Sequence, residues 1–162
     1  TAHMQARQYL LAVEPAKRAL AFFERMKDSF WIALNASNLA EAYVELSDLP
    51  LAEEYAQRVL AEEEPHSHPY ALFSLGRIRM RQNRTDEALL HLRQAEAIAE
   101  QNEDLFLLAY VYEELGAFYV DQDDVASARD ALTRAFEGFE QLGIDAKAEE
   151  VSSALANLSV AT

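Results

Sequence analysis

The sequence contains no cysteine, so disulfide bonds, catalytic thiols and thiolate metal ligands are all excluded. It has only four glycines and four prolines in 162 residues, too few for an all-β protein with many tight turns. No apolar run approaches the roughly 18 residues of a membrane-spanning helix, and no secretory leader is visible. We therefore expect a cytoplasmic protein with no membrane partner.

Positive charge is also scarce, because 14 basic residues face 28 acidic ones and the net charge is −14. Nucleic-acid binding depends on clustered Lys and Arg, so nucleic acid is not an expected partner. What the chain does have is 51% hydrophobic residues, with Ala, Leu, Glu, Gln and Arg abundant. These residue types favour helices and supply a core. The opening TAHM is typical of a cloning remnant, which predicts a domain taken from a longer protein.

Three copies of one pattern follow each other along the chain. Each begins with a Leu and a small residue, at Leu39-Ala40, Leu75-Gly76 and Leu115-Gly116, which gives a period of about 36 to 40 residues. An alanine follows each Leu at one constant interval, and further apolar residues come one and two helical turns after that alanine. These positions are Ala52, Ala56 and Val59 in the first copy, Ala88, Leu92 and Ala95 in the second, and Ala128, Leu132 and Ala135 in the third.

This pattern resembles the tetratricopeptide repeat (TPR), in a version with a period of about 36 to 40 residues, over about residues 33–142. The resemblance implies pairs of antiparallel helices whose Leu-Gly and Ala positions are small enough for close approach. Tyr43 and Tyr119 match a tyrosine of the family pattern, but Arg79 occupies that position in the second copy. We expect the stem of Arg79 to pack against the hairpin and its guanidinium to reach water.

The resemblance implies an all-α fold, an α-solenoid of stacked antiparallel helical hairpins in a TPR-like right-handed superhelix. We expect a single array over residues 1–162, with a partial repeat at 1–32 that includes the cloning remnant. Full repeats follow at 33–68, 69–108 and 109–144, and a capping or truncated helix at 145–162. Periodicity and turn residues predict helices at 4–13, 15–27, 30–46, 50–63, 69–82, 86–101, 104–121, 125–141 and 145–160.

Signals of catalysis and of metal binding are weak. The sequence has no glycine-rich phosphate loop, no His-Glu-x-x-His and no Gly-x-Ser-x-Gly, so we expect no enzyme, no catalytic residues and no cofactor. The acidic clusters lack the spacing of a calcium loop. Of the four histidines, His3 belongs to the opening TAHM, His66 and His68 lie in a proline-flanked turn, and His91 lies in a helix. A turn and a helix surface explain these histidines better than a metal site.

In the TPR family the first helix of each hairpin lines a concave groove that binds peptides. Carried over by position, the resemblance places a ligand groove at eight residues: Asn38, Glu41, Tyr70, Phe73, Arg77, Arg81, Tyr110 and Glu113. On the third copy the same face also includes Glu114, Ala117, Val120 and Asp121. Aromatic residues, Met and Arg at helical spacing are enriched in interaction hot spots. Arg84, further along, is expected in the hairpin turn.

Two questions about this groove remain open at the level of sequence. Arg77 and Arg81 either accept a carboxylate from a ligand or form ion pairs with glutamates of neighbouring helices, such as Glu41 and Glu45. Phe73 fits a groove anchor and a core position equally. One family subtype does not match, because the residues that grip a chaperone C-terminus correspond here to Ser37, Glu41, Ser74, Tyr110 and Glu114.

The sequence therefore predicts a non-catalytic protein–protein interaction scaffold, whose groove binds a peptide, a partner helix or a neighbouring domain. The partner is expected to be a protein or peptide with a carboxylate. One alternative is the sensor arm of a larger bacterial signalling NTPase or transcription regulator, as arrays with this period suggest. Another alternative is a self-association module that forms homo-oligomers through its apolar solenoid ends.

Overall fold

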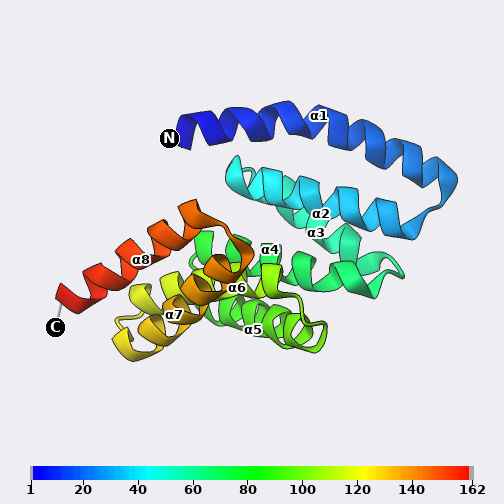
Figure 1. Ribbon diagram of the computed structural model, residues 1–162. Helices are drawn as coiled ribbons and strands as arrows, with labels where there is room; N and C mark the ends of the chain where they lie inside the picture. Colours follow the sequence, from blue (N-terminus) through cyan, green and yellow to red (C-terminus); the bar gives the residue numbers. More distant parts are fainter. Residues whose placement is uncertain (1, 161–162) are drawn as a thin grey trace. The chain divides into compact units, whose positions relative to one another are not determined.

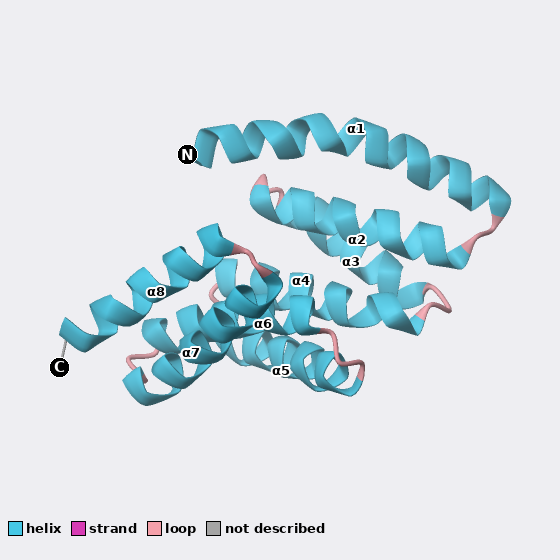
Figure 2. Cartoon of the chain, in the orientation of Figure 1, coloured by secondary structure: helices cyan, strands magenta, loops and turns pink. Residues whose placement is uncertain are grey.

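The computed structural model describes the backbone of residues 2–160 and the side chains of residues 7–158. His3, in the opening TAHM, lies outside the described side chains. Residues 2–160 form eight α-helices and one short 3-10 helix, η1, without a strand (Figure 1, Figure 2). The elements are α1 (Ala2–Met26), α2 (Ser29–Glu45), α3 (Leu49–Ala61), η1 (Pro65–Ser67), α4 (His68–Arg81), α5 (Thr85–Gln101), α6 (Leu105–Asp121), α7 (Val125–Leu142) and α8 (Asp145–Val160).

The ends of α2 to α8 agree with the predicted helices to within two residues, but the break predicted before Pro15 is wrong. Helix α1 runs through Pro15 without interruption. A proline inside a helix removes one backbone hydrogen bond, here the one to the carbonyl of Leu11. Pro15 and Leu11 are both exposed, so water can satisfy that carbonyl, while Val13 and Leu20 are buried in the core. Packing of the buried face therefore outweighs the local signal.

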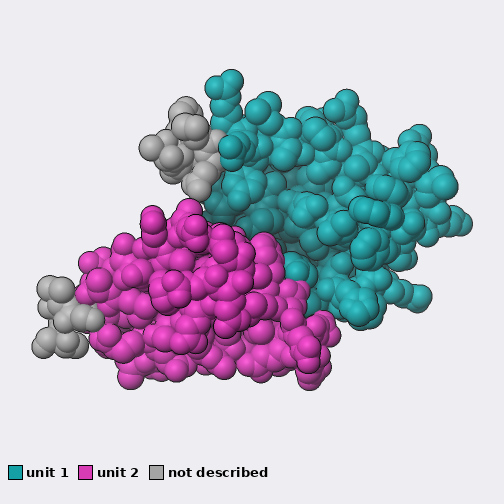
Figure 3. Space-filling model, in the orientation of Figure 1, with its two compact units in different colours: residues 1–91 teal, residues 92–162 magenta. Residues whose placement is uncertain are grey.

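The chain divides into two compact units, Thr1–His91 and Leu92–Thr162, which Figure 3 shows in different colours. In the first unit α1 packs against α2, α2 against α3, and α4 against both α2 and α3. In the second unit α6 packs against α7, and α7 against α8. Because the links from α1 to α2, α2 to α3, α6 to α7 and α7 to α8 are short, these successive helices form hairpins. Among residues 2–160, none of the helices combines the length and apolarity that crossing a bilayer requires.

Six of the seven links between helices share one backbone arrangement. After the helix comes a residue with a left-handed φ between 55° and 69°. The backbone amide of the residue after it donates to the carbonyl five residues earlier in the chain. The amide of Asp124, for example, donates to the carbonyl of Tyr119 at 3.0 Å. In four links that next residue is an aspartate whose carboxylate accepts an amide of the new helix. The left-handed residues are Lys27, Ser47, Asn83, Glu103, Asp123 and Gly143.

The repeated pattern of small and apolar residues forms the interior, which confirms its predicted role. Ala52, Ala88 and Ala128, the alanines at the constant interval after each Leu, are all fully buried. The positions one and two turns later are also buried in all three copies: Ala56, Val59, Leu92, Ala95, Leu132 and Ala135. Because these side chains are short, the helix backbones can approach closely.

Gly116 on α6 shows how close this approach is. A Cβ atom at Gly116 would lie 2.5 Å from Cδ2 and 2.6 Å from Cγ of Leu132 on α7. These distances are well inside van der Waals contact, so any side chain at Gly116 would displace Leu132. The Leu-Gly pair is therefore a packing requirement of the α6–α7 hairpin.

Arg79 occupies the tyrosine position of the second copy, and the prediction that its guanidinium reaches water is wrong. Only 7% of the residue is exposed. Its guanidinium donates to both carboxylate oxygens of Glu53 on α3, at 2.5 and 2.9 Å, and to the side chain of Gln82 at 2.9 Å. Its Nε also lies 3.3 Å from a carboxylate oxygen of Glu87 on α5. Arg79 thus joins α3, α4 and the start of α5 from the inside of the first unit.

The hydrogen bond from Arg79 holds the pKa of Glu53 below its ordinary value. A carboxylate with a lowered folded-state pKa stabilises the fold at every pH above its unfolded-state pKa. This stabilisation is lost as the pH falls through the lowered pKa. The Arg79–Glu53 pair therefore acts at neutral pH and disappears in acid.

We expect Gly116→Ala to lower the free energy of unfolding by about 1–3 kcal/mol, because the added methyl group overpacks against Leu132. Urea denaturation followed by circular dichroism measures this difference. Ala117→Ser, which adds one atom at the exposed neighbouring position, should change stability by less than about 0.5 kcal/mol. A Gly116→Ala protein as stable as the wild type would contradict the close approach of α6 and α7.

We expect Arg79→Met to lower the free energy of unfolding by about 1–3 kcal/mol at pH 7, because Glu53 loses a charged hydrogen-bond donor. The difference from wild type should begin to shrink as the pH falls below the unfolded-state pKa of Glu, about 4.3, and should disappear once the pH is below the lowered folded-state pKa of Glu53. Urea denaturation at pH 7 and at pH 3.5 measures both effects. Arg84→Met, at an exposed arginine of the α4–α5 turn, is the control and should change stability little. An equal loss of unfolding free energy at both pH values would rule out the assigned ion pair between Arg79 and Glu53.

Candidate functional site

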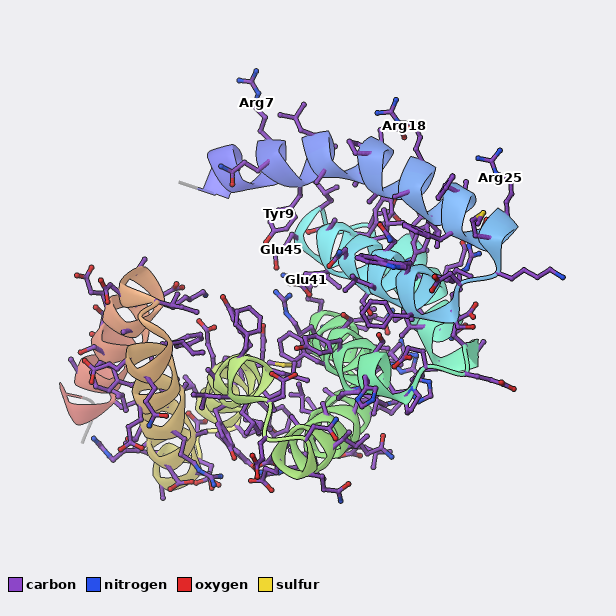
Figure 4. All side chains as sticks on the ribbon, turned by 45° about the vertical axis from the view of Figure 1, so that its right-hand side comes forward. Arg7, Tyr9, Arg18, Arg25, Glu41 and Glu45 are labelled. Atoms are coloured by element: carbon purple, nitrogen blue, oxygen red, sulfur yellow. The ribbon has the colours of Figure 1, made fainter. Side chains whose placement is uncertain are left out.

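In the first unit the predicted groove residues of α2 and α4 form an ion-pair cluster. Glu41 and Glu45 lie one turn apart on α2, and Arg77 on α4 donates one terminal nitrogen to each of them. The side chain of Arg77 is only 11% exposed. Figure 4 shows Glu41 and Glu45 on α2, with Tyr9 extending from α1 toward them. Arg77 is therefore paired within the chain, which was one of the two possibilities left open by the sequence.

Arg81, one turn after Arg77, has a different environment. It donates to the backbone carbonyl of Val44, near the C-terminal end of α2, where a positive charge is favourable. Another of its nitrogens lies 3.8 Å from Glu45, and the side chain is 37% exposed. Arg81 therefore reaches solvent from a position fixed by two groups of α2.

The remaining groove residues of the first unit differ in exposure. Phe73 is only 6% exposed, and the guanidinium of Arg77 lies 5.6 Å from the centre of its ring. Tyr70, one turn before Phe73, is half-buried, and Asn38 on α2 is exposed. Phe73 thus packs against Arg77 from the interior, while solvent reaches Asn38, Tyr70 and Arg81 and also Glu41, whose side chain is 36% exposed.

In the second unit Tyr110 and Glu113, both on α6, contact Lys147 of α8. The Lys147 ammonium donates to Glu113 at 2.8 Å and lies 3.2 Å from Glu150. It also lies 5.9 Å from the ring centre of Tyr110, whose ring packs edge-to-face on Phe139 at 5.0 Å. Lys147 thus connects α8 to the predicted face of α6.

Burial is the strongest influence on Glu113, and it raises the pKa of this carboxyl although Lys147 acts in the opposite direction. Burial alone would lower the pKa of Lys147, but the bonds to Glu113 and Glu150 outweigh it, and the pKa rises. Lys147 consequently keeps its charge at neutral pH. It offsets the negative charge that Glu113 brings to this part of the unit.

Next to this pair lies a pocket of about 300 Å³ between α6, α7 and α8. Four of its lining residues come from the predicted groove face of α6. Helix α7 contributes one further residue and α8 contributes three. The lining residues are Glu113, Ala117, Val120, Asp121, Leu132, Glu150, Val151 and Ala154. Five of these residues are apolar and three carry carboxylates, so the pocket combines an apolar lining with negative charge.

The predicted groove residues thus fall in two groups. The first unit holds Asn38, Glu41, Tyr70, Phe73, Arg77 and Arg81, and the second holds Tyr110 and Glu113. The sequence analysis missed Lys147 and the residues of α8, because residues 145–162 were interpreted as a capping or truncated helix and no groove residue was assigned to them. A signal was present: Lys147 follows Glu113 by 34 residues, and Arg77 follows Glu41 by 36, so opposite charges lie one repeat apart.

Where their side chains are described, the histidines and acidic clusters give no sign of a metal centre. Across the described side chains, no group of three or more His, Asp or Glu is arranged to hold a metal ion. His68 lies at the start of α4, and its Nε2 is 3.1 Å from the carbonyl oxygen of Glu62. His91 is half-buried within α5. Arg84 lies in the α4–α5 turn, as predicted, and is bonded to Glu87.

No protein-family model matches the sequence, and no curated protein matches it significantly. Solved structures do match. BtubC (BKLC) from P. vanneervenii aligns with 99% of this chain at a TM-score of 0.70 and 20% identity, and the chain spans 66% of that protein's length. Nearly identical TPR-like repeats of a Podosopora anserina protein assigned to the kinesin light chains align with 97% of this chain and 92% of their own, at a TM-score of 0.56 and 18% identity. The chain therefore has the fold of a TPR-like helical-repeat solenoid.

Proposed function

We propose that this chain is a non-catalytic protein-interaction scaffold that binds a peptide, a partner helix or a neighbouring domain, with α2 and α4 as the contact surface of the first unit and α6 as that of the second. Folds of the TPR-like type generally mediate protein–protein interaction and are generally non-catalytic. The observation that carries the proposal is the pocket of about 300 Å³, because the groove face predicted for α6 supplies half of its lining residues.

The volume and lining of this pocket suit a ligand with an apolar side chain and a basic neighbour. A volume of about 300 Å³ suits one large apolar side chain, such as Leu, Met or Phe, which Ala117, Val120 and Val151 would contact. The exposed carboxylates of Asp121 and Glu150 favour a basic residue next to that side chain. The second unit therefore fits a peptide in which an apolar residue is flanked by Lys or Arg.

The first unit contributes a different type of contact. Because Arg77 is already bonded to Glu41 and Glu45, recognition of a carboxylate falls to Arg81. Tyr70 and Asn38 add polar and aromatic surface on the same two helices. We therefore assign carboxylate binding to Arg81, with Arg77 holding α4 against α2.

We expect Ala154→Trp to weaken binding of an apolar-basic peptide more than tenfold, because the indole ring would occupy the pocket. Suitable peptides are selected from a display library against the wild-type chain, and their affinity is measured by fluorescence anisotropy. Ala156→Trp is the matched control, since Ala156 is exposed on the same helix and does not line the pocket. Equal affinities for both variants would remove the pocket from the binding site.

We expect Arg81→Glu to weaken binding of peptides with a free C-terminal carboxylate by about 10- to 100-fold, the usual value of a charged hydrogen bond. Amidated forms of the same peptides should bind both proteins equally. Arg84→Glu makes the same change of charge in the adjacent turn and should have little effect. If Arg84→Glu is as damaging as Arg81→Glu, the effect comes from overall charge and the assignment to Arg81 is wrong.

A further inference from the structure

Helix α1 has a second surface that the proposed groove does not include. One side of α1 packs into the first unit through Tyr9, Val13, Ala16, Leu20 and Phe23. Elsewhere on the helix several large apolar residues face solvent: Leu10, Leu11, Phe22 and Met26 are between 50% and 69% exposed. Isolated exposed apolar residues are ordinary, but several on one helix indicate an interaction surface.

The outer side of α1 also carries three arginines without an ion pair in the described part of the chain. Arg7, Arg18 and Arg25 point away from α2 in Figure 4. Most other described cations are paired, for example Arg58 with Glu24 and Lys17 with Glu14. These two pairs involve the only acidic residues of α1, so Glu14 and Glu24 are already engaged. In a chain with a net charge of −14, three such arginines on one helix face are exceptional.

The arginines and the apolar residues alternate along one line of the helix. The residues of this line are Arg7, Leu11, Pro15, Arg18, Phe22 and Arg25, which we call the α1 seam. Their successive spacings of three and four residues keep them on one side of a helix, as in the contact line of two packed helices. At a rise of about 1.5 Å per residue the α1 seam is about 27 Å long.

We propose that the α1 seam docks an acidic amphipathic helix. The helical spacing of the seam favours a helix as the occupant, because another α-helix presents side chains at the same intervals along about 27 Å. Charge complementarity selects its acidic character, with carboxylates opposite Arg7, Arg18 and Arg25. Leu11 and Phe22 bury the apolar residues of that helix between these ion pairs.

The charge of the whole chain favours a short acidic helix over a polyanion. Nucleic acid and anionic lipid surfaces carry many charges, which the excess of acidic residues in this chain would repel. A single helix brings few charges. At physiological salt its repulsion by acidic residues of the chain more than about 8 Å away is largely screened. The arginines can therefore attract it locally while the rest of the chain has little effect.

A synthetic helical peptide tests the proposal with the full chain. The probe has about 20 residues, enough to span the α1 seam at about 1.5 Å per residue. It carries Leu at spacings of three and four on an Ala background, with Glu on both flanks of the Leu line. A second peptide carries Lys in place of each Glu. Fluorescence anisotropy is measured at low and at high NaCl concentration. Because the pocket of the second unit is proposed to bind an apolar residue flanked by Lys or Arg, both peptides are compared on the Ala154→Trp chain, in which that pocket is filled. We expect this chain to bind the Glu peptide at least tenfold more tightly than the Lys peptide, and less tightly at the higher salt concentration.

The triple variant Arg7→Gln, Arg18→Gln and Arg25→Gln should bind the Glu peptide about tenfold more weakly, because each exposed ion pair contributes modestly. It should also lose most of the salt dependence. The matched control is Gln94→Glu, Ala97→Glu and Gln101→Glu, three exposed positions on α5 that make the net charge more negative by the same amount. This control should bind nearly as well as wild type. Circular dichroism confirms that both variants remain helical.

The apolar residues are tested separately. Leu11→Ala with Phe22→Ala should weaken the Glu peptide about tenfold and leave the salt dependence unchanged. An unchanged affinity would mean that the contact is only electrostatic, and docking of a helix along the α1 seam would be overturned. Ala154→Trp should leave binding of the Glu peptide intact, so failure of the pocket and failure of the α1 seam can be distinguished.

Three further results would overturn the proposal. The first is equal affinity of the Ala154→Trp chain for the Glu and Lys peptides. The second is tighter binding to mixed phosphatidylserine and phosphatidylcholine vesicles than to the Glu peptide, which would make a lipid surface the occupant. The third is a wild-type dimer in sedimentation that becomes a monomer in the arginine variant, which would make a second copy of this chain the occupant.

Discussion

The close approach of helix backbones at small side chains is the constraint on which the rest of this structure depends. Ala52 and Ala128 are fully buried, and Gly116 leaves no room for even a methyl group next to Leu132. Helices held this near to each other bring long side chains on their flanks into contact range. The ion pairs of Arg77 and of Lys147 are therefore consequences of the hairpin packing, because both join helices that the small residues have already aligned.

Charge in this protein has two roles, which the environments of its arginines separate. Arg79 is enclosed by Glu53, Gln82 and Glu87 and contributes to the interior of the first unit. Arg7 and Arg18, in contrast, extend from α1 into solvent without an ion pair in the described part of the chain. In an acidic protein, a few outer arginines that have no ion pair give an acidic partner a defined place to bind. Position in the fold, more than residue type, decides which role an arginine has.

The helices and their packing face could be predicted from the sequence, because short-range periodicity and the repeated Leu, Gly and Ala positions determine both. Pro15 misled the prediction, since the gain from burying Val13 and Leu20 on one continuous helix is invisible in the local sequence. The burial of Arg79 was missed for a related reason: its partners come from three segments that only the folded chain brings together. The pairing of Arg77 stayed open because glutamates one repeat away can either meet an arginine or face solvent, and spacing alone does not decide this.

The left-handed turns have a consequence for how such a chain can vary. Five of the six turn residues with positive φ are not glycine, although glycine would adopt this conformation at lower cost. Their geometry is imposed by backbone hydrogen bonds at the end of each helix, so the side chain at Lys27, Ser47 or Glu103 has little part in it. A polar residue there also reduces the freedom of the unfolded chain relative to glycine. Substitutions can therefore accumulate in the turns and alter surface charge while the hairpins keep their spacing.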